Sequence, residues 1–233
     1  MENNLIKDNT LRSKYVLLFF AVLAGIDALS IGLSLYQNSV LKGYEMGDYT
    51  DDYITNLDYA TMFIGILQFM GFVAIAVLFI KWFRRAYANL IRLEAKMDYT
   101  ENAAVWGYFI PFVNWVRPVK TMKEIFIKTQ NTIKTYDSTL VFDNNTGFIA
   151  AWWVVYLING FIANYASRTM TRANTIDDFI AANNVYIFAD LFDIASIALA
   201  VIVVQRIAKL ELSLLKIDKS VSIIDQIGTT SYD

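Results

Sequence analysis

Three carboxylates, Asp27, Asp190 and Asp193, lie within long apolar stretches that contain no lysine or arginine. A charge inside hydrocarbon is costly, so residues of this kind are candidate functional groups. Asp190 and Asp193 are three residues apart, which places both side chains on one face of a helix. Asp27 and Asp193 lie roughly 14 Å from one end of their stretches at 1.5 Å per residue, and Gln68 and Asn159 lie at roughly similar depth in two further stretches, about 7–9 residues from one end. We therefore predict one polar layer from these five residues.

The polar layer, defined as Asp27, Gln68, Asn159, Asp190 and Asp193, admits three interpretations. Protonated carboxyls and amides could hydrogen-bond between helices and hold a bundle together. Clustered carboxylates repel one another, so at least one would carry a proton at neutral pH, as a proton or cation site requires. The same groups could also bind a cationic or polyhydroxylated ligand.

Histidine and cysteine are both absent from the 233-residue chain. Their absence excludes zinc sites built from these residues, a serine–histidine triad, disulfides and the usual haem ligands. The aspartates lack the Gly-x-Gly-Asp string of intramembrane aspartyl proteases, and no glycine-rich phosphate loop occurs. We expect no enzyme activity, no cofactor and no metal. The net charge of −2 provides no basic face for nucleic acid.

The composition favours an α-helical integral membrane protein. Hydrophobic residues make up 56% of the chain and charged residues 18%, against roughly 45–50% and ~25% in an average soluble domain. A membrane-spanning helix needs about 20 apolar residues. Four stretches meet this length, with aromatic residues near several of their ends. The predicted spans are 15–36, 59–80, 147–165 and 184–204.

A fifth apolar stretch, residues 103–116, is shorter and contains Pro111. A run of this length is more typical of a re-entrant, interfacial or buried segment than of a complete span. Proline also removes a backbone donor and disfavours a continuous helix. We expect residues 103–118 to enter and leave the membrane surface on one side, although the length alone leaves a crossing open.

The basic residues predict the orientation of the spans. Seventeen of the 20 lysines and arginines lie in the two terminal segments and the connection 81–146, and three lie in the other two loops. The side that is richer in these residues is cytoplasmic. Both termini are therefore expected in the cytoplasm. An odd number of spans would disrupt this distribution.

Two segments of the long connection have the pattern of basic amphipathic helices. Residues 81–97 continue the second span, and residues 119–135 place Met122, Ile125 and Ile133 on one side. Helices of this kind beside a membrane lie in the interface and meet anionic lipid head groups. Their simplest role is to anchor the connection.

A spaced motif runs through the same region. Trp82-x-x-Arg85-Ala86-x-x-Asn89 is followed by Trp106-x-x-Phe109-Ile110-Pro111-x-x-Asn114-x-x-Arg117-Pro118, and then by Met122, Glu124 and Trp152-Trp153. Over roughly residues 60–165 this pattern resembles the bacterial membrane proteins of domain-of-unknown-function family 4328, with Trp115 where that family typically has leucine. The resemblance implies a multi-pass bacterial membrane protein and implies no activity.

The core of the motif has a physical interpretation as a kinked elbow. Pro111 frees backbone carbonyls, and Asn114 can bond such groups, as backbone at membrane depth requires. Arg117 can pair with a carboxylate such as Glu124 or with a lipid phosphate. Pro118 suits the first turn of a following helix. A ligand site at the same residues is the alternative.

Together these patterns predict an all-α integral membrane protein. It has four transmembrane helices, a Pro-containing re-entrant or interfacial segment and cytoplasmic amphipathic helices. Residues 1–219 form one transmembrane domain, and residues 220–233 form a mobile cytoplasmic tail. The expected location is a bacterial cytoplasmic membrane.

We expect a structural or partner-binding membrane module, with a small proton, cation or solute transporter as the alternative. Its partners are the lipid bilayer, anionic lipid head groups at the cytoplasmic face, and either other proteins or further copies of the chain.

Overall fold

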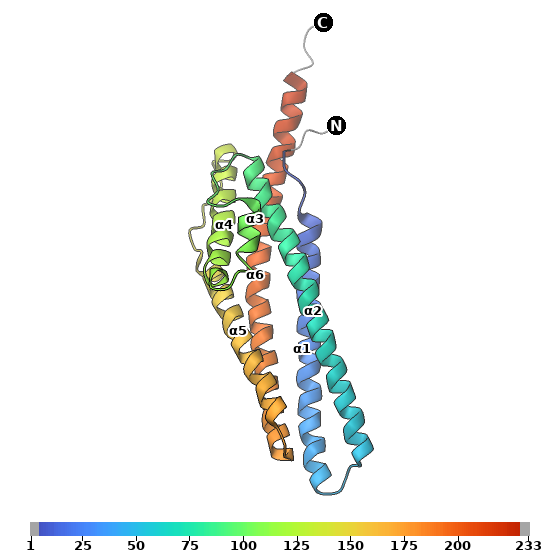
Figure 1. Ribbon diagram of the computed structural model, residues 1–233. Coiled ribbons are helices and arrows are strands. Elements are labelled where there is room, and N and C mark those ends of the chain that lie inside the picture. The colour runs from blue at the N-terminus through green and yellow to red at the C-terminus, as the bar shows by residue number, and fades with distance from the viewer. Residues whose placement is uncertain (1–4, 229–233) are drawn as a thin grey trace. The chain divides into compact units, whose positions relative to one another are not determined.

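The computed structural model describes residues 5–228, and the side chains of residues 5–217. Every regular element in this part of the chain is helical (Figure 1). The elements are α1 (Thr10–Glu45), α2 (Asp51–Arg92), α3 (Glu101–Trp106), the short 3-10 helix η1 (Val113–Trp115), α4 (Arg117–Tyr136), α5 (Gly147–Arg172) and α6 (Ile176–Gly228). The predicted all-α class is confirmed.

Helices α1, α2, α5 and α6 are each long and apolar enough to cross a membrane, and each contains one of the predicted spans. The apolar window of α2 is only 11% buried inside the protein, and that of α5 only 17%. Soluble proteins rarely leave apolar surface of this extent exposed to water. The exposed apolar faces therefore indicate a multi-pass membrane protein.

The chain forms two compact units. Unit 1 comprises Met1–Leu17, Val77–Trp153 and Val201–Asp233, and unit 2 comprises Leu18–Ala76 and Val154–Ala200. The single domain over residues 1–219 stays a prediction. Within the predicted tail 220–233, α6 continues to Gly228, and residues 229–233 lie outside the described part of the chain.

The core of unit 1 is rich in aromatic side chains. Trp82, Phe83 and Tyr87 of α2 are completely buried. Tyr108 packs edge-on against Phe83, at 4.9 Å between ring centroids, and against Trp153 at 5.6 Å. Edge-to-face packing of this kind adds to the stabilisation from burial. Burial raises the pKa of Tyr108 above its ordinary value, so the phenol stays neutral.

Helix α4 has the amphipathic pattern that the sequence predicts. Met122, Ile125, Phe126 and Ile133 are buried at spacings of three, four, seven and eight residues, while the lysines lie on more exposed faces. Pro118 occupies the first turn, where its missing N–H costs nothing. The helix expected over residues 119–135 is confirmed.

The end of α2 differs from the prediction, which extended the helix to residue 97. The helix ends at Arg92, and Glu94 has φ of 57°. Glu94 N donates to Ile91 O and Ala95 N donates to Leu90 O, at 3.0 and 3.1 Å. These two bonds form a Schellman motif, in which a left-handed residue closes the last turn. Sequence pattern missed it because glycine is the usual residue at that position.

A tight turn follows Pro111. Phe112 has φ of 62°, and Val113 N donates to Pro111 O at 2.7 Å, which is the bond of a γ-turn with positive φ. A bulky residue in this region is strained. The turn nevertheless leaves the Phe112 ring largely exposed.

The small cluster of Ile6, Ile133, Leu214 and Leu215 allows a matched test of unit 1. Leu214→Ala should lower the free energy of unfolding by about 2–5 kcal/mol, because it removes a side chain that is 4% exposed. Leu212→Ala, at a residue 43% exposed on the same helix, should change it by about 0.5 kcal/mol at most. Denaturation in detergent, followed by tryptophan fluorescence, measures both. Equal losses would contradict the packing described here.

Candidate functional site

The five residues of the polar layer all lie in unit 2, and the structure brings them together. Gln68 of α2 donates from Nε2 to Asp27 Oδ1 of α1 at 2.9 Å and to Asp190 Oδ1 of α6 at 3.0 Å. An amide nitrogen carries two hydrogens, so both bonds can form at once. Gln68 therefore joins three helices.

The fourth helix enters the layer through Asn159 of α5. Its Nδ2 donates to Asp193 Oδ1 at 2.5 Å. The carboxyls of Asp190 and Asp193 are both electrostatic neighbours of Asp27. Three carboxyls thus share one region of the bundle and receive two amide side chains. Whether this layer is a functional site stays a prediction.

The layer holds more acceptors than donors. Asp27 is 2% exposed and Asp190 is 7% exposed. The Oδ2 atoms of both residues are buried with no hydrogen-bond donor. The Asp27 carboxyl has those of Asp190 and Asp193 as electrostatic neighbours, and two carboxyl oxygens can bond to each other only through a proton or a cation. Among the residues whose side chains are described, no group of three or more acidic side chains is arranged to hold a metal ion.

A second polar cluster in unit 2 was not identified from the sequence. Gln37 Nε2 donates to Asp58 Oδ1 at 2.8 Å, and Asn183 Nδ2 donates to Gln37 Oε1 at 3.2 Å and to Asn38 Oδ1 at 3.0 Å. Asn38 Nδ2 in turn donates to Asn184 Oδ1 at 3.0 Å. These residues lie close to the predicted span ends, where polar side chains are ordinary. The sequence signal that could have indicated this cluster is the set of three asparagines and one glutamine at the ends of the first and fourth predicted spans that lie on the same side.

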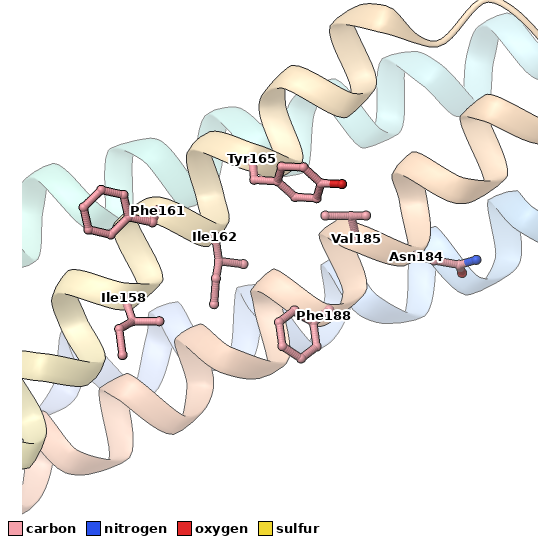
Figure 2. A pocket seen from close by; sticks show the side chains of 7 residues that line it. All are labelled: Ile158, Phe161, Ile162, Tyr165, Asn184, Val185 and Phe188. Carbon is pink, nitrogen blue, oxygen red and sulfur yellow. The ribbon is translucent and has the colours of Figure 1, made fainter.

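Unit 2 also has an apolar cavity of about 470 Å³ between α5 and α6. Figure 2 shows its lining, which comes from Ile158, Phe161, Ile162 and Tyr165 of α5 and from Asn184, Val185 and Phe188 of α6. The lining suits hydrocarbon, and its polar side-chain groups are the Tyr165 hydroxyl and the Asn184 amide. Neither this cavity nor the one in unit 1 described below is lined by a residue of the polar layer.

In unit 1, the first half of the motif binds the N-terminal segment. The Asn89 side chain accepts from Lys7 N at 3.1 Å and donates to Lys7 O at 2.9 Å. Trp82 accepts at its carbonyl from Asn9 Nδ2 at 3.0 Å, and its Nε1 donates to Glu211 Oε2 at 3.1 Å. Arg85 Nη1 makes a longer bond to Asp8 O at 3.4 Å. The motif residues therefore hold an irregular segment against α2 and α6.

Glu124 is the centre of a second network in unit 1. It accepts from the Tyr87 hydroxyl at 2.8 Å, from Asp98 N at 2.5 Å and from Lys128 Nζ at 2.7 Å. The proposed pairing of Arg117 with Glu124 is wrong. Arg117 instead donates to Ala103 O at 3.4 Å and lies 4.9 Å from the centre of the Tyr99 ring.

The expected role of the Asn114 side chain is also not observed. Its backbone carbonyl accepts from Trp153 Nε1 at 2.8 Å, and its N–H donates to Ile110 O. The side-chain Oδ1 is buried without a donor. The backbone carbonyls around Pro111 accept hydrogen bonds from backbone N–H groups and from the Trp153 indole. The side-chain amide of Asn114 is therefore not required as their partner. Pro111 itself is exposed.

The contribution of Gln68 can be measured with a substitution of similar shape. Gln68→Met removes both amide bonds and should lower the unfolding free energy by about 1–2 kcal/mol, since interhelical bonds in membranes average about 0.6 kcal/mol each. Phe69→Met, at the neighbouring exposed position, is the control and should have little effect. Unfolding in mixed micelles gives both values. No difference between the two variants would show that the bridge does not stabilise the bundle.

Comparison with protein families gives one match. The family described as Domain of unknown function (DUF4328) matches residues 49–209, well over half of the chain. Comparisons with curated proteins and with solved structures find no match. The matched region contains the whole motif from Trp82 to Glu124 and four of the five residues of the polar layer. The chain belongs to the DUF4328 family.

Proposed function

We propose that the chain is a non-enzymatic membrane module of a bacterial cytoplasmic membrane. Its four spans hold unit 1 at the cytoplasmic face, where unit 1 acts as a structural or partner-binding platform in envelope assembly. The observation that carries this proposal is the use of the polar layer. The side-chain amides of Gln68 and Asn159 donate hydrogen bonds to carboxyls on other helices, as expected for groups that hold a helical bundle together.

The distribution of charge supports the cytoplasmic placement of unit 1. The connection 81–146 carries ten of the 20 basic residues, and it lies entirely in unit 1. Basic residues remain on the cytoplasmic side when spans insert. The amphipathic helix α4 and the last part of α2 belong to this connection, so they are the cytoplasmic helices of the proposal.

The exposed aromatic side chains of the elbow support an interfacial segment over residues 103–118. Trp106, Phe109, Phe112 and Trp115 are all exposed. Aromatic rings of this kind favour the level of the lipid head groups. The strained turn at Phe112 keeps its ring exposed instead of burying it in the protein. We propose that this segment enters the interface without crossing the bilayer.

The orientation can be tested with single cysteines, since the chain contains none. Val141→Cys and Met46→Cys place one thiol at exposed positions in the two loops that the proposal assigns to opposite sides. A membrane-impermeant maleimide added outside intact cells should label Met46→Cys. Labelling of Val141→Cys should require permeabilised cells. The reverse pattern would refute the cytoplasmic platform.

Transport of protons, small cations or a small solute is the second candidate. It is favoured by the unpartnered Oδ2 atoms of Asp27 and Asp190, because buried acids without donors can take up and release protons. A pathway would also need access from both sides. The five residues line neither of the cavities described here, which favours the structural role.

Proteoliposomes that contain a pH-sensitive dye distinguish the two candidates. The proposal expects proton flux no faster than in empty liposomes under an imposed membrane potential. If the layer conducts instead, the natural chain should show flux, and Asp27→Asn and Asp193→Asn should lower it at least about tenfold. Asp58→Asn, outside the polar layer, is the control and should retain it. Flux that is lost only in the layer variants would replace the structural proposal with transport.

A further inference from the structure

Unit 1 contains a cavity of about 240 Å³ between the N-terminal segment, the start of α1 and α6. Three exposed lysines, Lys7, Lys14 and Lys209, line it. Within the described residues, no ion pair joins any of the three to a carboxylate. The cavity therefore gathers positive charge that the protein itself does not neutralise at contact distance.

Two carboxylates, Asp8 and Glu211, also line the cavity, and both are already hydrogen-bonded within the protein. Asp8 Oδ1 accepts from Thr10 N at 2.8 Å, at the first residue of α1. Glu211 Oε1 accepts from Asn9 Nδ2 at 2.9 Å, and its Oε2 accepts from Trp82 Nε1 at 3.1 Å. These acids stabilise the walls of the cavity and leave the lysines available to an anion.

Asn9 adds an acceptor without a partner. It lines the cavity, is 4% exposed, and its Oδ1 is buried without a donor. Its orientation is set by its surroundings, because the opposite amide assignment would point the oxygen at Trp82 O and the Glu211 carboxylate. A buried acceptor of this kind is costly unless a ligand or water donates to it. The lysines and the Asn9 acceptor together are complementary to an anion that also carries a hydroxyl or N–H group.

The position along the chain places the cavity beside the membrane surface. Lys14 immediately precedes the span that begins at residue 15, and Lys209 follows the end of the span at residue 204 by five residues. Five residues of helix rise about 7.5 Å. The head-group region on each side of a bilayer is about 5–8 Å thick. Lipid phosphates lie at this depth, whereas a soluble ligand would have to compete with them.

We propose that this cavity binds the head group of an anionic phospholipid, whose phosphodiester meets the three lysines and whose hydroxyl donates to Asn9 Oδ1. A phosphatidylglycerol head group has this chemistry. The proposal rests on the cytoplasmic placement of unit 1, which the cysteine labelling tests independently of lipid binding. It assigns one defined lipid site rather than a general attraction of basic helices to the membrane.

Lipid binding is measured on the full chain in phosphatidylcholine nanodiscs titrated with phosphatidylglycerol, by native mass spectrometry of retained lipid. Replacing all three lysines, as Lys7→Gln, Lys14→Gln and Lys209→Gln, should weaken retention about tenfold or more, at about 1 kcal/mol per basic residue near the surface. The control removes equal charge outside the cavity, as Lys96→Gln, Lys120→Gln and Lys123→Gln, and should weaken it less than about threefold. Equal losses in the two triple variants would overturn the site.

The role of Asn9 is tested on the unaltered chain, so folding of a variant does not enter. Phosphatidylethanol is an anionic phosphodiester lipid without head-group hydroxyls. It should bind about fivefold more weakly than phosphatidylglycerol, as the loss of one hydrogen bond to a buried acceptor implies. Equal binding of the two lipids would refute the hydroxyl contact.

The free head group, glycerophosphoglycerol, distinguishes a lipid from a soluble ligand. Added to the chain in pure phosphatidylcholine nanodiscs, it should give no saturable binding at concentrations where phosphatidylglycerol is retained. Tight binding of the free head group would overturn the assignment to a lipid and show that the cavity takes a soluble phosphodiester.

Discussion

A polar side chain inside hydrocarbon must find its hydrogen-bond partners within the protein, because no water is available to it. Gln68 is the residue through which unit 2 meets this constraint. Its amide nitrogen donates to the carboxyls of Asp27 and Asp190 on two other helices, at 2.9 and 3.0 Å. Asn159 donates to the third carboxyl, that of Asp193. The register of the four helices is restricted by these bonds, since a shift of one residue in α2 would rotate Gln68 away from both aspartates.

The same constraint acts differently in unit 1, where the donors and acceptors are mostly backbone groups of irregular segments. Asn89 replaces the partners that the backbone of Lys7 would have in a sheet. Glu124 of α4 accepts hydrogen bonds from Tyr87, Lys128 and the backbone amide of Asp98. These bonds hold the segment after α2 against α4. Buried side chains thus hold the connecting segments where regular structure ends.

Much of this organisation could be predicted from the sequence, because a membrane span leaves its signal in one continuous stretch of the chain. Spans are defined by length and apolarity along the chain, so α1, α2, α5 and α6 were identifiable, and depth counted along each span gathered Asp27, Gln68 and Asp190 into one layer. Pairings between distant irregular segments leave no periodic trace. The sequence offers Glu124 or a lipid phosphate as a partner for Arg117, and the structure gives Arg117 and Glu124 other partners within the protein. The contacts of Asn9 with Glu211 join residues about two hundred positions apart, and no local pattern indicates them.

The atoms that the motif uses suggest why it can hold a segment outside the matched family region. The family match begins at residue 49, whereas Lys7 and Asn9 precede it. The hydrogen bonds of Asn89 to Lys7, and that of Arg85 to Asp8, are made to backbone atoms. Backbone recognition fixes the path of a segment while leaving its side chains unconstrained. Lys7 and Asp8, whose backbone is held in this way, both line the cavity in unit 1. Of the motif residues, Asn89 lines that cavity, and the segment that it holds contributes Lys7, one of the three lysines.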